Sequence, residues 1–243
     1  MKEKHFELTD EFVVNLLGVK LFRIRCTKKT KYANVGDLGG FIEKEDNLSG
    51  NAWVSGNAWV SGNARVHGYA RVSGNACVYG DARVSGDARV SGNAWVYDNA
   101  WVYGNACVSG NAWVYGNACV SGNAWVYGNA WVYGNACVSG NAWVYGNARV
   151  SGDANLSGNA RVHGDARVDS DNKHCGFDCF GSANRHTHAY LTKDNTVEVT
   201  CGCFRGSLEA FEKQVEETHK GTDYEKQYKA IINVIKIKFN LPI

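Results

Sequence analysis

Four cysteines near the C-terminal end have the residue type, though not the most common spacing, of a zinc site. They form one C-x3-C pair and one C-x-C pair, at Cys175, Cys179, Cys201 and Cys203. Four thiolates can hold a tetrahedral zinc ion and stabilise a small module. The C-x-C spacing is less typical than C-x2-C, and cysteine is often an ordinary core residue. Two interpretations stay open, a zinc centre and free thiols.

Aromatic residues and arginines recur at a spacing of six and are suited to binding. If three six-residue units make one coil, residues 18 apart stand in one column. One column carries Trp59, Trp95, Trp113 and Trp131, and the column beside it carries Tyr79, Tyr97, Tyr115 and Tyr133. The two other faces carry Arg65 with Arg83 and Arg71 with Arg89. A flat exposed aromatic field predicts an interface with a second protomer, or a platform for planar ligands.

The aromatic columns could also arise without an interface. Aromatic residues suit the surface of a strand and can stack on each other within one chain. The segment GNACVSGNAWVY also occurs identically at 104–115, 116–127 and 134–145. A 12-residue copy does not fit an 18-residue coil, so duplication could have placed the rings without regard to face.

Residues for catalysis are sparse. His67 and His163 stand at outward positions, on different faces and far apart, and the repeat contains no inserted loop. We find no glycine-rich phosphate loop, Ser-His-Asp order or paired carboxylates. The sequence therefore predicts a protein that is not an enzyme.

The elements that position these residues follow from a strict six-residue period. From Leu48 to Val168 every sixth residue is Val, except Leu48 and Leu156, and the residue two before it is Ala from Ala52 to Ala166. Alternation by two places Ala and Val on one face, and Gly with Asn or Asp then makes a corner. Short strands joined by regular corners predict an all-β solenoid of about seven coils with an aliphatic core.

The units Gly-Asn-Ala-Trp-Val-Tyr resemble the hexapeptide repeat of left-handed parallel β-helices, with three units per coil. The lead-in LFRIRCTKKTKYANVGDLGGFIEKEDNLSGNAWV is similar to the start of the YdcK-like branch, often called polymer-forming. The tail FGSANRHTHAYLTKDNTVEVTCGCFRGSLEAFEKQVEETH is similar to a module behind such repeats in phage and prophage proteins. The resemblance implies the architecture and a bacterial or viral setting.

The period divides the chain into residues 1–47, 48–169 and 170–243, the repeat between two capping modules. In the first, we expect a short helix and then a strand around Lys20 to Cys26. In the last, we expect a β-hairpin turning near Lys193 to Asn195 and two helices, the first with Ser207 as N-cap. Such modules would cover the strand edges that an open solenoid exposes.

Composition restricts the setting and the partners. The formal net charge is +2, so no overall field favours nucleic acid, and no apolar run is long enough for a membrane span. Nine cysteines without a signal peptide indicate a cytoplasmic protein, in the host cytoplasm if phage encoded.

These observations together predict a non-catalytic binding or scaffold protein. We expect a homo-oligomer, a dimer or trimer formed through a flat face, with a host protein or a nucleotide-like ligand as a further partner. No cofactor is expected unless the C-terminal cysteines bind zinc. Three alternatives are a protein that sequesters a nucleotide signal against host defence, a hexapeptide-repeat acyltransferase and a cytoskeletal polymer.

Overall fold

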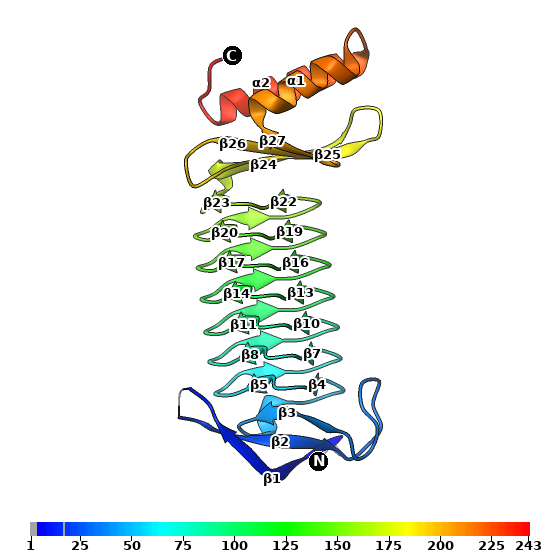
Figure 1. The fold of residues 1–243 in the computed structure, drawn as a ribbon, viewed down its shortest axis with the longest axis vertical. Coiled ribbons are helices and arrows are strands. Elements are labelled where there is room, and N and C mark those ends of the chain that lie inside the picture. The colour runs from blue at the N-terminus through cyan, green and yellow to red at the C-terminus, as the bar shows by residue number, and fades with distance from the viewer. Residues whose placement is uncertain (1–3, 17) are drawn as a thin grey trace.

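The computed structural model describes residues 4–16 and 18–243. Its middle is a parallel β-solenoid that winds in coils of 18 residues, each contributing one short strand to each of three sheets (Figure 1). The predicted solenoid of about seven coils, with three units per coil, is confirmed. Because residue i pairs with residue i+18, the columns predicted from the period are the columns of the sheets.

Each strand of the solenoid is two residues long. The first sheet has ten strands, seven of them from the repeat: β5 (Trp59–Val60), β8 (Cys77–Val78), β11 (Trp95–Val96), β14 (Trp113–Val114), β17 (Trp131–Val132), β20 (Arg149–Val150) and β23 (Arg167–Val168). The second sheet has β4 (Trp53–Val54), β7 (Arg71–Val72), β10 (Arg89–Val90), β13 (Cys107–Val108), β16 (Trp125–Val126), β19 (Trp143–Val144) and β22 (Arg161–Val162). The third has β6 (Arg65–Val66), β9 (Arg83–Val84), β12 (Trp101–Val102), β15 (Cys119–Val120), β18 (Cys137–Val138) and β21 (Asn155–Leu156).

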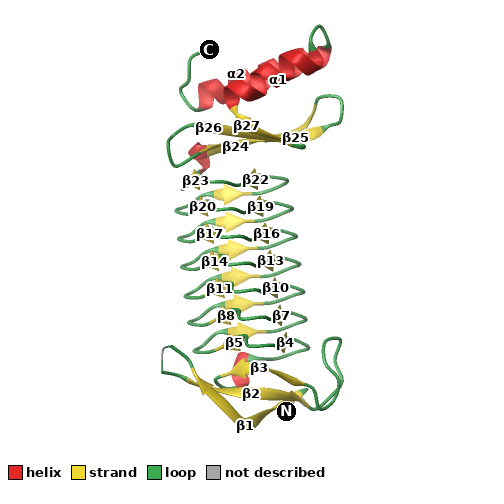
Figure 2. Cartoon of the chain, in the orientation of Figure 1, coloured by secondary structure: helices red, strands yellow, loops and turns green. Residues whose placement is uncertain are grey.

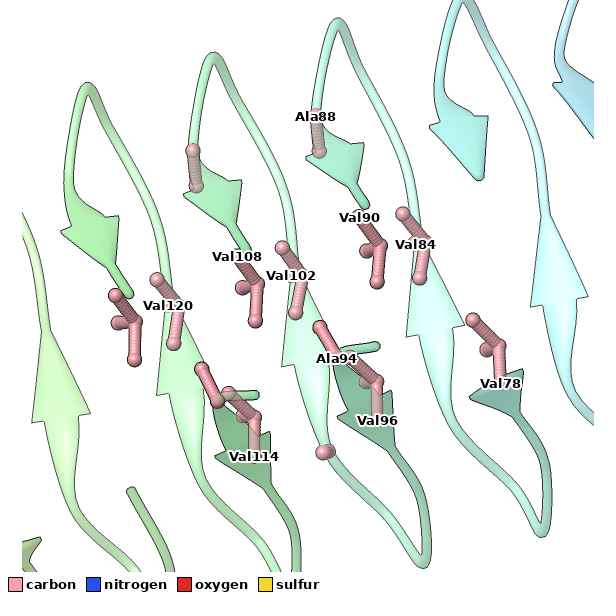
Figure 3. Close-up of a cluster of buried hydrophobic side chains, with 14 of the residues drawn as sticks. Val78, Val84, Ala88, Val90, Ala94, Val96, Val102, Val108, Val114 and Val120 are labelled. Carbon is pink, nitrogen blue, oxygen red and sulfur yellow. The ribbon is translucent and has the colours of Figure 1, made fainter. Parts of the chain in front are cut away.

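The inward side chains fill the tube completely. Every valine of the repeat from Val54 to Val168 is 0% exposed, and so is nearly every alanine two residues before it. Figure 3 shows valines from the three sheets, such as Val90, Val96 and Val102, turned toward the axis between successive coils. Burying each valine contributes roughly 1.5–3 kcal/mol of gross stabilisation, which offsets part of the cost of ordering the chain.

The corners require glycine for two reasons. At Gly110 the backbone has φ +69°, a left-handed conformation that other residues adopt at a cost. A Cβ atom on Gly110 would also lie 2.9 Å from the backbone nitrogen of Gly128, one coil further on. Within the repeat, which the structure describes in full, only Asp98 replaces a corner glycine, with φ 57°.

We expect Gly110→Ala to destabilise the solenoid more than Gly221→Ala destabilises the connection between the two helices. Gly221 has φ +76° with no atom within 4 Å of an added Cβ, so it isolates the backbone cost of about 1–2 kcal/mol. Contact with the next coil adds roughly 1–3 kcal/mol at Gly110. Urea unfolding followed by tryptophan fluorescence for Gly110, and by helix ellipticity for Gly221, measures both. Equal losses in the free energy of unfolding for the two variants would show that neighbouring coils move apart at no cost.

The N-terminal end is an antiparallel extension of the first sheet. Strands β1 (Phe6–Val14), β2 (Lys20–Cys26) and β3 (Leu38–Ile42) precede the repeat, and β3 pairs with β5 so that Ile42 lies beside Val60. A short 3-10 helix (Glu45–Asn47) follows. The short helix expected before Lys20 was wrong, because β1 hydrogen-bonds along β2 and the paired strands bury Phe6 against the end of the core.

The C-terminal end is a small α+β layer (Figure 2). A 3-10 helix (Asp171–Lys173) leads into the antiparallel strands β24 (His174–Phe180), β25 (Arg185–Leu191), β26 (Val197–Cys201) and β27 (Phe204–Ser207). Helices α1 (Leu208–His219) and α2 (Asp223–Lys238) pack on this sheet around a second hydrophobic core. The predicted hairpin turn and both helices are confirmed, and Ser207 accepts a hydrogen bond from the backbone nitrogen of Ala210. Within the described ranges, neither helix is long and apolar enough to cross a bilayer.

Candidate interaction surface of the solenoid

The predicted aromatic columns form one ordered structure on the first sheet. The Trp95 and Trp113 rings stack with centroids 5.2 Å apart, and Trp113 and Trp131 are 5.4 Å apart. A parallel stack of tyrosines runs beside them at spacings of 4.9–5.0 Å. Tyr79, Tyr97 and Tyr115 each also meet the Trp of the next coil in a T-shaped contact at 6.0–6.2 Å. We call the following eight residues the aromatic ladder: Trp59, Trp95, Trp113, Trp131, Tyr79, Tyr97, Tyr115 and Tyr133.

Burial favours the neutral form of three tyrosines of the ladder. Burial is the largest cause that raises the pKa of Tyr79, Tyr97 and Tyr115, with neighbouring acidic or phenolic groups adding to it. Burial also raises the pKa of Cys77, between Trp59 and Trp95 in the same column, to about 12. All eight rings are half-buried by their neighbours, so they present edges to solvent and are less exposed than the sequence suggested.

Asparagine side chains border the ladder on both sides. At one corner, amides donate from each coil to the next over 3.0–3.2 Å without a gap, through Asn57, Asn75, Asn93, Asn111, Asn129, Asn147 and Asp165. At the other corner the run is Asn99, Asn117, Asn135 and Asp153. The period by itself predicts only that these residues form corners. Their second role, linking coils through side chains, follows from the same 18-residue spacing.

A second aromatic column lies on the second sheet, and its rings were not among the predicted binding residues. Trp125 and Trp143 stack at 6.0 Å, and Tyr127 and Tyr145 at 5.0 Å. The column continues through His163, which lies 5.3 Å from the Tyr145 ring. The signal is present in the sequence, because the two tyrosines and His163 follow one another at intervals of 18 residues.

The four predicted arginines form two separate pairs. Arg65 and Arg83 are neighbours on the third sheet, and Arg71 and Arg89 are neighbours on the second. All four are exposed. The Arg83 guanidinium lies 5.0 Å from the Trp101 ring, so that face does combine arginine with an aromatic ring. A cavity of about 280 Å³ lies beside Arg65 and Arg83, with Lys44, Asp46 and Asp81 among its lining residues, so its charges are mixed.

The two histidines of the repeat lie in different environments. His67 is exposed on the third sheet, and partial burial, Arg83 and Arg65 lower its pKa. His163 is half-buried under the C-terminal layer, and burial lowers its pKa first, with Arg205 adding to it. They are not neighbours, as expected.

The structure separates the four C-terminal cysteines. Cys201 is buried, and its Sγ accepts a hydrogen bond from Thr187 Oγ1 at 3.3 Å. Cys175 is partly buried against the same core, while Cys179 and Cys203 are exposed. In the described part of the chain, no three His, Cys, Asp or Glu side chains gather in a metal-binding arrangement. All nine cysteines are free thiols, including Cys119 and Cys137, which are neighbours on the third sheet.

The repeat matches a known family of β-solenoids. The YdcK β-solenoid repeat matches residues 52–68, 70–86, 82–98, 88–104, 100–116, 112–128, 118–134 and 130–146. These matches cover most of the solenoid and neither end of the chain. No curated protein matches this sequence. With its coils of 18 residues and its aliphatic core, the middle of this chain is similar to the YdcK β-solenoid repeat.

Proposed function

We propose that this protein is a non-catalytic scaffold that associates side by side with a second copy of itself through the aromatic ladder. The observation that carries the proposal is an uncharged field of eight rings on one straight sheet, with asparagine ladders on both borders. An apolar centre with a hydrogen-bonding rim is the usual anatomy of a protein interface. Tyrosine and tryptophan are the residue types that contribute most to such contacts.

The spacing of the ladder favours a second copy over another partner. The rings repeat once per coil, at about 4.8 Å. A partner that meshes with this spacing over several coils must carry the same period, and a second copy of the chain does so. Closed association through one flat face gives a dimer or a trimer. The modules at both ends cover the strand edges and argue against end-to-end polymers.

Two features support a role without catalysis. The coils carry no inserted loop in which an acyl donor could lie, and His67 and His163 belong to different sheets. For the setting, we propose a bacterial or phage protein of the cytoplasm. This rests on the likeness of the tail to phage modules and on nine free thiols.

Removing the three stacked tryptophans is expected to reduce the mass of the assembly to that of the 26.6 kDa monomer. Trp95→Ser/Trp113→Ser/Trp131→Ser places in the ladder a residue that the repeat already uses on its outer surface, so the core is unchanged. Light scattering after size exclusion measures the mass. The matched control is Trp101→Ser/Trp125→Ser, which removes the two most exposed tryptophans, 47% and 43% exposed, from the other sheets. An unchanged mass for the triple variant, or a monomeric wild type, would overturn the proposal.

A further inference from the structure

A cleft in the C-terminal layer has the composition of a small-molecule site. Its volume is about 470 Å³, and it lies between strands β25–β27 and helices α1 and α2. The lining residues all belong to the C-terminal layer, and none of them is part of the aromatic ladder.

Aromatic rings form the inner wall of this cleft. Phe204 and Phe211 lie 5.1 Å apart, and Phe211 meets Tyr228 edge-on at 5.7 Å. His219 stacks on Tyr228 at 5.3 Å. Phe211 and Tyr228 are buried, while Phe204 and His219 are half-exposed, so two of the four rings remain accessible from the cleft. Rings arranged in this way accept a planar group between or against their faces.

The mouth of the cleft is cationic. Arg185 and Arg205 line it, and Arg161 lines an adjoining cavity of about 240 Å³ that shares Arg185. The lining of these two cavities includes no Asp or Glu. Among residues 4–16 and 18–243, none of the three guanidinium groups forms an ion pair, although Arg161 donates to the carbonyl oxygen of Gly202 at 3.3 Å.

The turn between β26 and β27 holds these arginines in place. Gly202 occupies the turn with φ +59°, and a Cβ atom there would lie 2.7 Å from Cδ of Arg185. The missing side chain therefore lets Arg185 cross the turn. Toward the solenoid, the Arg161 guanidinium lies over the Trp143 ring at 5.3 Å, and the Arg205 guanidinium lies over the Tyr145 ring at 5.1 Å. Stacking on a ring orients a guanidinium while leaving its N–H donors available.

We infer that this cleft binds a small molecule in which a planar ring carries a phosphate or a carboxylate. The ring lies against the aromatic wall, and the anion accepts hydrogen bonds from the Arg185 guanidinium, while Arg205, whose guanidinium lies over Tyr145 of the solenoid, adds only longer-range positive charge. Guanidinium groups match both anions through paired donors. Gln214 and Thr218, at the rim on α1, supply polar groups that fix orientation.

Cysteine alkylation tests the inference with a control inside the same module. Cys203 lines the cleft and is exposed, whereas Cys179 is exposed outside it. We expect phenyl phosphate or benzoate to slow the reaction of Cys203 with iodoacetamide and to leave Cys179 unaffected. The stronger of the two protectants identifies the anion. Inorganic phosphate and benzyl alcohol, each with half of the required chemistry, are expected to protect far less.

Calorimetric titration of phenyl phosphate tests the arginines directly. Arg185→Gln is expected to weaken binding about tenfold or more, because it removes a charge-assisted hydrogen bond, and Arg205→Gln, whose guanidinium lies over Tyr145, is expected to weaken binding less. Arg89→Gln, on the solenoid, is the matched control and is expected to bind as wild type. Three results would overturn the inference: no protection of Cys203 by either aromatic anion, equal slowing of Cys179, or equal protection by inorganic phosphate. The alkylation result stands even if an arginine variant fails to fold.

Discussion

Val102→Asp is expected to unfold the solenoid, whereas Trp101→Asp, one residue earlier on strand β12, is expected to leave it folded. Val102 is 0% exposed and pairs with Val84 and Val120 in the neighbouring coils. A carboxylate there meets only aliphatic side chains, which provide no partner for its charge. We expect a loss of about 4 kcal/mol or more, a large part of the total stability of an ordinary domain.

Trp101 points outward and is 47% exposed. Aspartate at this position loses a ring beside Arg83 but places a carboxylate near the same guanidinium, so we expect a change within about 1 kcal/mol. Urea unfolding followed by tryptophan fluorescence reports on the solenoid, because all eight tryptophans lie between Trp53 and Trp143. Equal effects of the two substitutions would contradict the assignment of inward and outward residues.

Acid is expected to detach or unfold the C-terminal layer before the solenoid. His188 is 1% exposed at the junction, where its Nδ1 lies 3.1 Å from the carbonyl oxygen of Arg161 and its Nε2 lies 3.2 Å from Nδ1 of His174. Burial, followed by His174, lowers the pKa of His188 to about 3. The other groups that face this cluster are His186, Tyr190, Asp171, Asp178 and Lys238.

His188 binds a proton more weakly in the folded chain than in the unfolded chain. The folded pKa of His188 is below the ordinary value of 6.5, so between these two values the unfolded chain binds the proton and the folded chain does not. The contribution of neutral His188 to the free energy of unfolding is therefore fully present above the unfolded pKa. Below that pKa it falls by about 1.4 kcal/mol for each pH unit. Burial lowers the pKa of His174 as well, so protonation of His174 adds to the loss of stability at low pH. Between neutral pH and about pH 4.5 we expect a loss of roughly 2–3 kcal/mol.

The helix signal in circular dichroism isolates this effect, because α1 and α2 both belong to the C-terminal layer. The urea midpoint of the helix signal is expected to fall on acidification, while the urea midpoint of the solenoid, followed by tryptophan fluorescence, is expected to change less. His188→Gln removes the titrating group and is expected to flatten the profile, whereas His67→Gln, on the third sheet, keeps the wild-type profile. A helix midpoint independent of pH over this window would contradict the role of His188.

Most features of the solenoid could be predicted from the sequence alone. A period of six fixes which residues turn inward, and three units per coil fix which residues share a column, so Trp95 beside Trp113 and Cys119 beside Cys137 could be predicted without coordinates. This is possible because each coil contacts only its neighbours, and every contact recurs at the same separation. The helices after Ser207 were also predictable, since cap and apolar spacing are local signals.

Only the tertiary structure determined the orientation of the rings within the columns and the contacts within the two terminal modules. It showed that the rings of the ladder stack face to face within each column and meet edge to face between the two columns, which depends on side-chain rotation rather than on position. It paired β1 with β2 where a helix was expected, and it separated Cys175 from Cys203 while placing Arg161, Arg185 and Arg205 around one turn. Outside the repeat no period relates distant residues, so their contacts arise only when the whole chain packs.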